Sequence, residues 1–333
     1  MPTQSIPRTA NLSRDRFYKE FVEPGQPVVI EDAARNWPAV SKWSIEYLAK
    51  NAGDVEVDLR ALDLSKWPGT FLQNGRSKLR DYILDLETPR EEETNWPPLR
   101  LAEQPMSRIF PALVDDLGES RLGRCSPEDF SIMISAGTTA AMHYHPRSEA
   151  ISYQIKGKRR FVLFPPSETR SLDPMPVEGP MANFSRRIID EHEVSTLSED
   201  AYDATITEGE AIFIPIHWWH TVFSSPTLSI LAVDFFRYGH KKKPCNDVSE
   251  RVRLLDEHCL RTISSEEASL RSTTDPDKCR ETLERIISLA RILDDPHLEQ
   301  SYLHRGLSSL DKTDARHASW TERLLKLGAA DRR

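Results

Sequence analysis

The sequence predicts a mainly β protein with helical additions, in which a barrel or double-sheet jelly roll lies between N-terminal α/β elements and C-terminal helices. Three observations predict it. Residues 1–125 mix short helical and extended patterns, and residues 126–240 repeat short runs rich in β-branched and aromatic residues. From residue 245 to residue 333, apolar residues recur three and four positions apart, which is typical of helices. We therefore expect three regions with these boundaries.

The N-terminal region opens with recognisable short elements. The apolar run Pro27–Ile30 predicts a short buried strand. Residues 43–53 follow with a helical pattern, for which Ser44 is a suitable N-cap. Residues 54–62 alternate between polar and apolar positions, as in a second strand. Residues 63–125, which include the turn signals WPG and NWPP, leave the order of their elements open.

The barrel prediction rests on the central region. Its runs are short, and glycine, proline and acidic residues separate them. Many short strands of this kind favour a closed barrel or a double-sheet jelly roll, because both arrangements protect strand edges. The runs are DFSIMIS (129–135), ISYQIKG (151–157), KRRFVLFPP (158–166), EAIFIPI (210–216) and LSILAVDFF (228–236).

Composition narrows the class of protein. The chain of 333 residues has 38% hydrophobic and 29% charged residues, as in ordinary globular proteins. A net charge of -8 argues against a broad surface for nucleic acid. No apolar run is long enough to span a membrane, and the first residues lack a secretory signal. Together with four scattered cysteines, these features predict a cytoplasmic protein.

Three histidines predict a catalytic metal site. His143 and His145 are two residues apart, so on an extended segment both side chains point to the same face. His220 lies far along the chain, after an apolar run and a turn at Pro215. A barrel brings such distant strands side by side. Imidazole is a ligand for iron, zinc, copper and nickel, so we expect these three side chains to bind one metal ion, with iron preferred.

Two neighbouring residues complete the candidate site. Glu149 is either a fourth, oxygen ligand of the metal or a surface carboxylate that pairs with Arg147 or Lys158, and the sequence leaves both open. His217 is interpreted as a residue that lines the pocket, and not as a ligand. A lone HxH pair is weak, but here Gly137 precedes it, Gly157 follows, and a G-x5-P segment leads to the distal histidine.

Long ordered motifs support a family resemblance. Over most of residues 20–240 the chain resembles the cupin-like JmjC group, especially relatives of the factor-inhibiting asparaginyl hydroxylase. That resemblance implies a double-stranded β-helix (cupin/jelly-roll) barrel and a non-haem Fe(II) oxygenase that uses 2-oxoglutarate and dioxygen. The motifs are PVVIEDAARNWPAVSKWSIEYL, HYHPRSEAISYQIKGKRRFVLFPP, GEAIFIPIHWWHTVFS and LSILAVDFFRYG.

The resemblance also implies roles for individual residues. His143 and His220 match the two histidine ligands of the family. Arg159 stands where the family keeps a lysine that pairs with the distal carboxylate of 2-oxoglutarate, and arginine can make that contact with two hydrogen bonds. Thr139, or its neighbour Thr138, and Tyr153 would add hydrogen bonds. The C-terminal helices resemble, in position, helices that pair subunits, which implies a possible homodimer.

The chain departs from the family at three positions. His145 replaces an aspartate ligand, Asp234 replaces an asparagine near the 2-oxoglutarate carboxylate, and Ala150 replaces another asparagine. An ionised Asp234 would repel the dianion unless it were protonated or paired. The pattern HxH, Glu149 and distal His220 also resembles the general cupin signature, whose members hold iron, manganese, nickel or copper with three histidines and a glutamate.

Three functions follow from these alternatives. The first is a 2-oxoglutarate-dependent oxygenase that hydroxylates a small molecule or an amino-acid side chain, including one in a peptide. The second is a cupin oxygenase with a three-histidine, or three-histidine-one-glutamate, centre that uses dioxygen without 2-oxoglutarate. The third is a catalytically inactive cupin that binds a ligand, and the metal-ligand residues speak against it. Nucleic acid and membrane partners are not expected.

Overall fold

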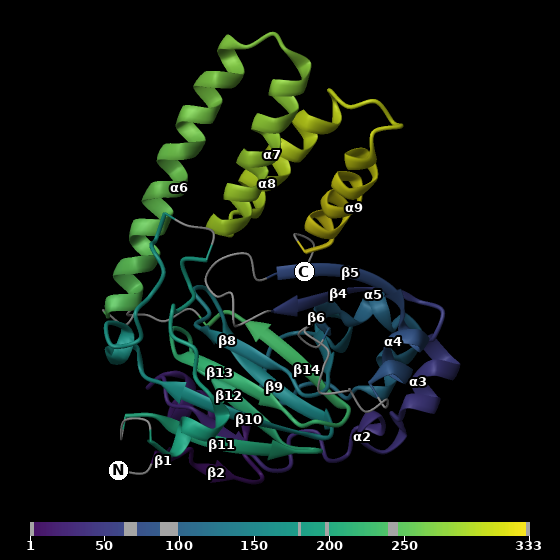
Figure 1. The fold of residues 1–333 in the computed structure, drawn as a ribbon, viewed down its shortest axis with the longest axis vertical. Helices are drawn as coiled ribbons and strands as arrows, with labels where there is room; N and C mark the ends of the chain where they lie inside the picture. Colours follow the sequence, from purple (N-terminus) through teal and green to yellow (C-terminus); the bar gives the residue numbers. More distant parts are fainter. Residues whose placement is uncertain are drawn as a thin grey trace. The chain divides into compact units, whose positions relative to one another are not determined.

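The computed structural model describes most of the chain and divides it into two compact units (Figure 1). The first unit holds Met1–Met175 and Asn183–Ser249, and the second holds Pro176–Ala182 and Glu250–Arg333. The WPG and NWPP turns lie outside the described residues. Those residues are 3–62, 72–86, 99–178, 181–196, 200–238 and 246–330.

Two β-sheets form the first unit, as the predicted double-sheet fold requires (Figure 1). The smaller sheet has five strands, in the order β1 (Gln4–Ser5), β11 (Tyr202–Thr207), β10 (Lys158–Phe164), β13 (Trp219–Ser224) and β8 (Thr139–His143). The larger sheet has nine strands, in the order β2 (Arg8–Thr9), β3 (Val28–Ile30), β12 (Ala211–Ile214), β9 (Glu149–Lys156), β14 (Ser229–Phe236), β7 (Ser131–Ser135), β6 (Arg100–Pro105), β4 (Glu56–Leu62) and β5 (Leu72–Lys78).

One hydrophobic cluster contains side chains from both sheets, and we call it the inner core. Because successive side chains on a strand point to opposite faces, this cluster shows which face of each strand is turned toward the other sheet. It therefore defines the interior of the barrel. Its buried members are Ile6, Val29, Ala150, Phe161, Leu163, Ile206, Ile212, Ile214, Trp218, Leu231 and Val233.

A second cluster, the outer core, covers the opposite face of the nine-stranded sheet. It joins alternate strand residues such as Ile134, Ile151 and Phe236 to the N-terminal helices. Ser44 accepts a hydrogen bond from the Tyr47 amide and so caps one of these helices, as predicted. The helices are α1 (Arg14–Phe17), α2 (Pro38–Lys42), α3 (Ile45–Ala52), α4 (Leu79–Asp85) and α5 (Met106–Ile109), with a π-helix at Tyr18–Val22 and 3-10 turns at Pro111–Asp116, Pro127–Asp129, Pro166–Thr169 and Glu191–Thr196.

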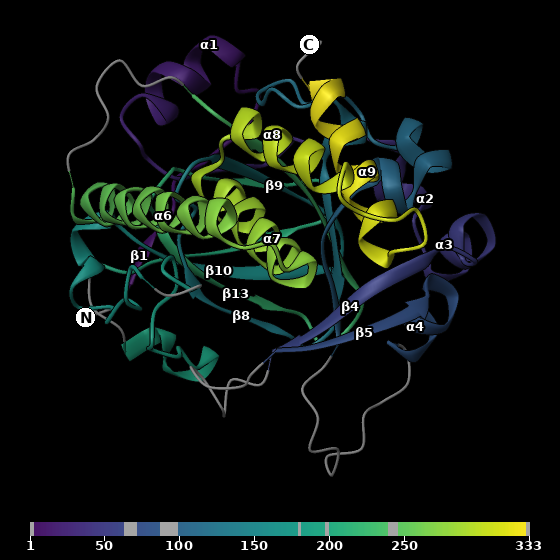
Figure 2. The same ribbon diagram turned by 90° about the horizontal axis from the view of Figure 1, so that it is seen from above.

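The second unit is helical, in agreement with the periodicity of the C-terminal region. Two of its helices begin at aspartate caps, Asp275 and Asp295, each followed by proline at the first helical position. Their apolar faces meet in a core around Ile286, Leu303 and Trp320. No helix in the described part of the chain is both long and apolar enough to span a membrane. The helices are α6 (Asp247–Ser272), α7 (Pro276–Leu293), α8 (Pro296–Leu307) and α9 (Ala315–Ala330), and α6 and α7 run side by side (Figure 2).

Candidate metal centre

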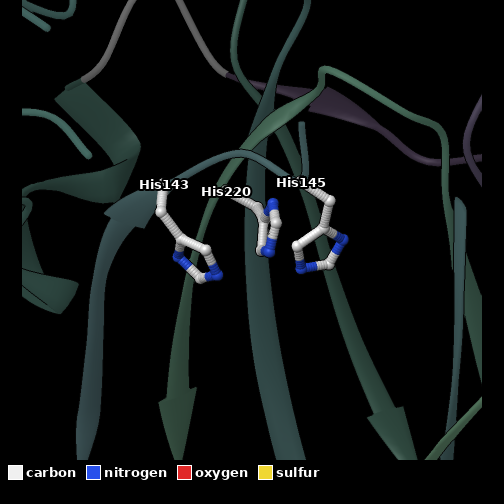
Figure 3. A group of neighbouring side chains, drawn as sticks. All are labelled: His143, His145 and His220. Carbon is white, nitrogen blue, oxygen red and sulfur yellow. The ribbon is translucent and has the colours of Figure 1, made fainter. Parts of the chain in front are cut away.

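The fold brings the three predicted histidines together. His143 ends β8 and pairs in register with His220 on β13, and His145 follows two residues later. Ring centroids are 4.2 Å apart for His143 and His220, and 4.6 Å apart for His145 and His220. Figure 3 shows the His220 ring between the other two. One nitrogen from each ring lies within 4.8 Å of the others, close to the spacing of about 3–4 Å that nitrogens on one ion have.

Backbone carbonyls fix the tautomer of two of these rings. His143 Nδ1 lies 2.8 Å from the Ala141 carbonyl oxygen, and His220 Nδ1 lies 3.0 Å from that of Trp218. A carbonyl oxygen can only accept, so each Nδ1 carries the proton and donates it. Each Nε2 therefore keeps a free lone pair for a metal ion, and the carbonyl contact also holds the ring in place.

Burial of His220 and partial burial of His143 and His145 favour the neutral form of all three imidazoles. Desolvation lowers the pKa of His143 and of His220, and lowers the pKa of His145 to about 3. His145 Nδ1 is buried, and no described residue forms a hydrogen bond with it. Three neutral imidazoles with available lone pairs fit a first-row transition metal. A bound ion would give the buried ring nitrogens a partner for these lone pairs.

The same pKa shifts predict how stability depends on pH. The pKa of these histidines in the folded protein lies below the unfolded value of about 6.5. Below pH 6.5 the histidines are therefore protonated in the unfolded chain but stay neutral in the folded protein. Stability of the metal-free protein should therefore fall as the pH drops from 7 toward 5, by up to about 1.4 kcal/mol per pH unit for each group. Urea unfolding at several pH values measures it. His145→Gln should reduce the slope, and an unchanged slope would contradict the assignment.

Glu149 lies apart from the histidines. It opens β9 opposite Phe236 of β14, and Phe236 belongs to the outer core. Its neighbour Ala150 belongs to the inner core, so the carboxylate of Glu149 faces the other side of the sheet. There it accepts a hydrogen bond from the Ile216 amide. The structure does not bring this carboxylate to the three imidazoles.

Tyr153 and Asp234 also face the outer core. Each alternates along its strand with residues of the inner core. The Tyr153 hydroxyl lies 2.6 Å from Ser120 Oγ. The Asp234 carboxylate accepts hydrogen bonds from the amides of Arg124 and Cys125, at 3.2 and 3.4 Å, while its burial raises the pKa. The sheet thus separates Asp234 from an anion inside the barrel, so the repulsion expected from the sequence has no basis here.

Arg159, in contrast, lies inside the barrel on β10. Its guanidinium donates hydrogen bonds to Ser229 Oγ at 2.9 Å, to Ser135 Oγ at 3.0 Å and to the Ser229 carbonyl at 3.2 Å. Burial lowers its pKa to about 9. Within the described residues, no carboxylate forms an ion pair with it. A buried cation without a counter-ion is costly, so this position fits the distal carboxylate of 2-oxoglutarate.

Thr139 faces away from Arg159, but Thr138 lies closer. Thr139 pairs with Phe223. The neighbour of Phe223, Val222, packs against the inner core, so Phe223 and Thr139 point to the opposite face. The Thr138 hydroxyl lies 3.0 Å from Ser224 Oγ, and Ser224 pairs in register with Arg159. A register shift between His220 and Val222 places a bulge in this ladder, which changes the face of the residues before His143.

Three polar residues around Arg159 were not predicted. Ser135 and Ser229 accept its hydrogen bonds, and Gln154 donates to Ser229 Oγ at 3.0 Å. A signal for them exists in the sequence. On β7, Ser131 and Ser135 make one face partly polar, with Met133 between them, while Ile132 and Ile134 form the apolar face. The polar face points into the barrel.

A double-sheet barrel with three imidazoles gathered at the ends of neighbouring strands defines a cupin-type protein with a candidate metal site. Comparison with known families agrees, because the cupin-like domain family matches residues 14–242, well over half of the chain. The chain therefore belongs to the cupin-like, JmjC-type family. JmjC members use Fe(II) and 2-oxoglutarate, and the cluster of His143, His145 and His220 fits the metal site.

Several curated relatives share this domain. Lysine-specific demethylase 8 of Xenopus tropicalis is 26% identical over 66% of this chain and 50% of its own length. Arginine-specific demethylase JMJ22 of Arabidopsis thaliana is 27% identical over 76% of this chain and 52% of its own. tRNA wybutosine-synthesizing protein 4 of Gibberella zeae is 27% identical over 70% of this chain but 23% of its own length. The chain thus spans about half of the first two relatives and about a quarter of the third.

Proposed function

We propose that the protein is a non-haem Fe(II) oxygenase that uses 2-oxoglutarate to hydroxylate an amino-acid side chain, free or in a peptide, or another small molecule. His143, His145 and His220 would hold the iron, and Arg159 would hold the distal carboxylate of 2-oxoglutarate. The observation that carries the proposal is the pairing of three neutral imidazoles with a buried, uncompensated guanidinium inside one barrel.

Different residues of the chain would bind the metal, bind the co-substrate and exclude water. The Ala141 and Trp218 carbonyls hold the rings of His143 and His220 in the orientation that a metal needs. Arg159 binds and orients an anion, and its serine partners keep the guanidinium fixed. Inner-core side chains on β14 exclude water from the same interior. Iron with 2-oxoglutarate would supply the activation of dioxygen.

One observation favours a second candidate. Because His145 is an imidazole where the family has a carboxylate, the site holds one negative charge fewer than a 2-His-1-carboxylate centre. Such a centre also suits a cupin oxygenase that takes electrons from its organic substrate and needs no 2-oxoglutarate. A cupin that binds a ligand without catalysis is the third candidate.

One experiment separates the three candidates. Anaerobic addition of Fe(II) and then 2-oxoglutarate should produce a visible charge-transfer band, and glutarate, which lacks the keto group, should not. Iron binding without a band, together with oxygen consumption on a small substrate, would favour the second candidate. If the protein binds no iron, and His143→Ala changes none of its properties, only the third candidate, the inactive ligand-binding cupin, remains. His192→Ala removes an exposed histidine and serves as the control.

The names of the relatives and the acidity of the chain support an amino-acid or peptide substrate. Among the relatives, the names of two refer to demethylation at lysine or arginine and one to wybutosine synthesis in tRNA. A net charge of -8 favours an amino-acid or peptide substrate over RNA. Peptide and amino-acid libraries should yield a product heavier by one oxygen atom, with succinate released in equal amount.

A homodimer through the C-terminal helices and a cytoplasmic location stay predictions of the sequence. The helical unit exposes Leu260 on α6 and Leu325 on α9, with exposed fractions of 52% and 71%. Apolar side chains on a helix surface are available for a partner. Light scattering on the full chain would give the mass of the assembly.

A further inference from the structure

Two paired arginines lie on the face of the nine-stranded sheet that carries the barrel interior. Arg60 on β4 pairs in register with Arg100 on β6. The next pair, Leu59 and Leu101, is buried in the outer core, so both arginines point to the opposite face. Arg60 is exposed and Arg100 is half-buried. The pair therefore extends from solvent toward the interior.

Arg100 lies beside the serine that contacts Arg159. Leu101 pairs with Ile134 on β7, and one step along the same ladder places Arg100 across from Ser135. The Ser135 hydroxyl accepts a hydrogen bond from Arg159 at 3.0 Å. Ser135 thus contacts the Arg159 guanidinium and lies across from Arg100 in the sheet.

A buried tyrosine fixes the backbone at this point. Tyr82 of α4 is 4% exposed, and its hydroxyl donates to the Ile134 carbonyl at 2.7 Å. The amide of Leu101 donates to the same hydroxyl at 3.2 Å. Tyr82 therefore bridges β6 and β7 next to Arg100, which holds this residue in place before any ligand binds.

The charge of Arg100 is poorly balanced. Its Nε is buried and has no hydrogen-bond partner among the residues that the structure describes. Burial lowers the pKa of Arg100, and after burial the charge of Arg100 is the next cause that lowers the pKa of Arg159. The acid that offsets it is Glu103, an exposed residue in the left-handed region (φ 51) at the register shift of β6.

We propose that Arg100 forms a carboxylate-binding subsite beside Arg159, on the wall of the barrel that leads to the three histidines. A planar guanidinium matches a carboxylate with two parallel hydrogen bonds, and two neighbouring cations demand more negative charge than Glu103 supplies. The subsite deepens the proposed function and rests on it, because both ligands would occupy the same barrel.

Two sources can supply that carboxylate. The co-substrate would place its distal carboxylate between Arg100 and Arg159. Alternatively, Arg159 alone holds the co-substrate, and Arg100 holds an acidic group of the organic substrate. The exposed Arg60 would attract either anion toward the interior.

Calorimetric titration of the full chain tests the first source. Glutarate is titrated into the metal-free wild type and into Arg100→Met, Arg100→Lys and Arg159→Met. Loss of charge-assisted hydrogen bonds should weaken glutarate binding roughly tenfold or more in Arg100→Met, with partial recovery in Arg100→Lys. Arg76→Met is the matched control, because Arg76 is exposed and its charge is already balanced by Asp58 at 3.2 Å.

A second titration tests the other source. N-acetylglutamate is added to anaerobic protein saturated with Fe(II) and 2-oxoglutarate. If glutarate binding is unchanged in Arg100→Met but binding of this probe is lost, the carboxylate comes from the substrate. If neither probe binds the wild type, or neither responds to substitution of Arg100, the subsite does not exist. Circular dichroism checks that each variant is folded. If Arg100→Met does not fold, Arg100→Lys is used in its place in both titrations.

The two hypotheses fail separately. Without the visible band of iron and 2-oxoglutarate, but with glutarate binding that depends on Arg100, the proposed oxygenase fails and the subsite stands. With a normal band and no effect of Arg100 in either titration, the subsite fails and the oxygenase stands.

Discussion

His220→Ala should lower the iron affinity of the protein by at least about a hundredfold. Loss of a residue that only orients a ligand already costs about 10–100-fold in other metal sites, and this substitution removes one of three ligands. The two remaining imidazoles, one at the end of β8 and one two residues later, would leave the ion mainly with water. Iron content after dialysis, and calorimetric titration with Fe(II) under anaerobic conditions, measure the effect.

Three comparisons make that result specific. His192→Ala should keep wild-type iron affinity, because His192 is exposed and distant in sequence from the cluster. His145→Asp should bind iron, since it restores the carboxylate that the family has at this position. Thermal unfolding of metal-free His220→Ala should remain cooperative. A folded His220→Ala protein with the iron content of the wild type would show that the three histidines are not the metal site.

The histidine cluster was predictable because its signal is local. Residues two apart on an extended chain, such as His143 and His145, point to the same face. The distal His220 lies on a strand that the barrel places next to the strand of His143. Arg159 was predictable for a similar reason, since its strand carries Phe161 and Leu163 on the same face. The bulge after His220, however, changes the face to which Thr139 points, and the sequence has no pattern that predicts this bulge.

The faces of β9 and β14 were not predictable. Nearly every residue of these two strands is buried, on both faces of the sheet. Alternation then shows that Glu149, Tyr153 and Asp234 lie on one side or the other, but it does not show which side is the interior. The N-terminal helices that cover the outer face decide it, and their packing involves contacts far apart in sequence.

Arg100 was missed for a related reason. Residues 63–125 are rich in turn signals, so the position of β6 in the sheet cannot be read from periodicity. Its place depends on the Tyr82 hydroxyl and on pairing with β4 and β7, which are non-local contacts. Charge alone did not distinguish this arginine from the many others in the chain.

Arg159→Leu should weaken 2-oxoglutarate binding about a hundredfold while iron binding without the co-substrate stays unchanged. The buried guanidinium is the one inner-facing cation of β10 in the described residues, and a carboxylate that loses a bidentate, charge-assisted partner loses most of its binding energy. Titration of the iron-loaded protein, followed by the charge-transfer band, measures the effect. Arg159→Lys should recover part of the affinity, because the family keeps a lysine there.

Stability of the same variant distinguishes a binding role from a structural one. A buried charge without a counter-ion costs free energy, so its replacement by leucine should leave the metal-free protein as stable as before or more stable. If Arg159 instead served to hold Ser135 and Ser229 together, Arg159→Leu would lower the unfolding midpoint and leave 2-oxoglutarate affinity intact. Arg159 is a buried cation that lowers stability, and its hydrogen-bond partners are serines and not carboxylates. These properties are expected of a site that binds an anion.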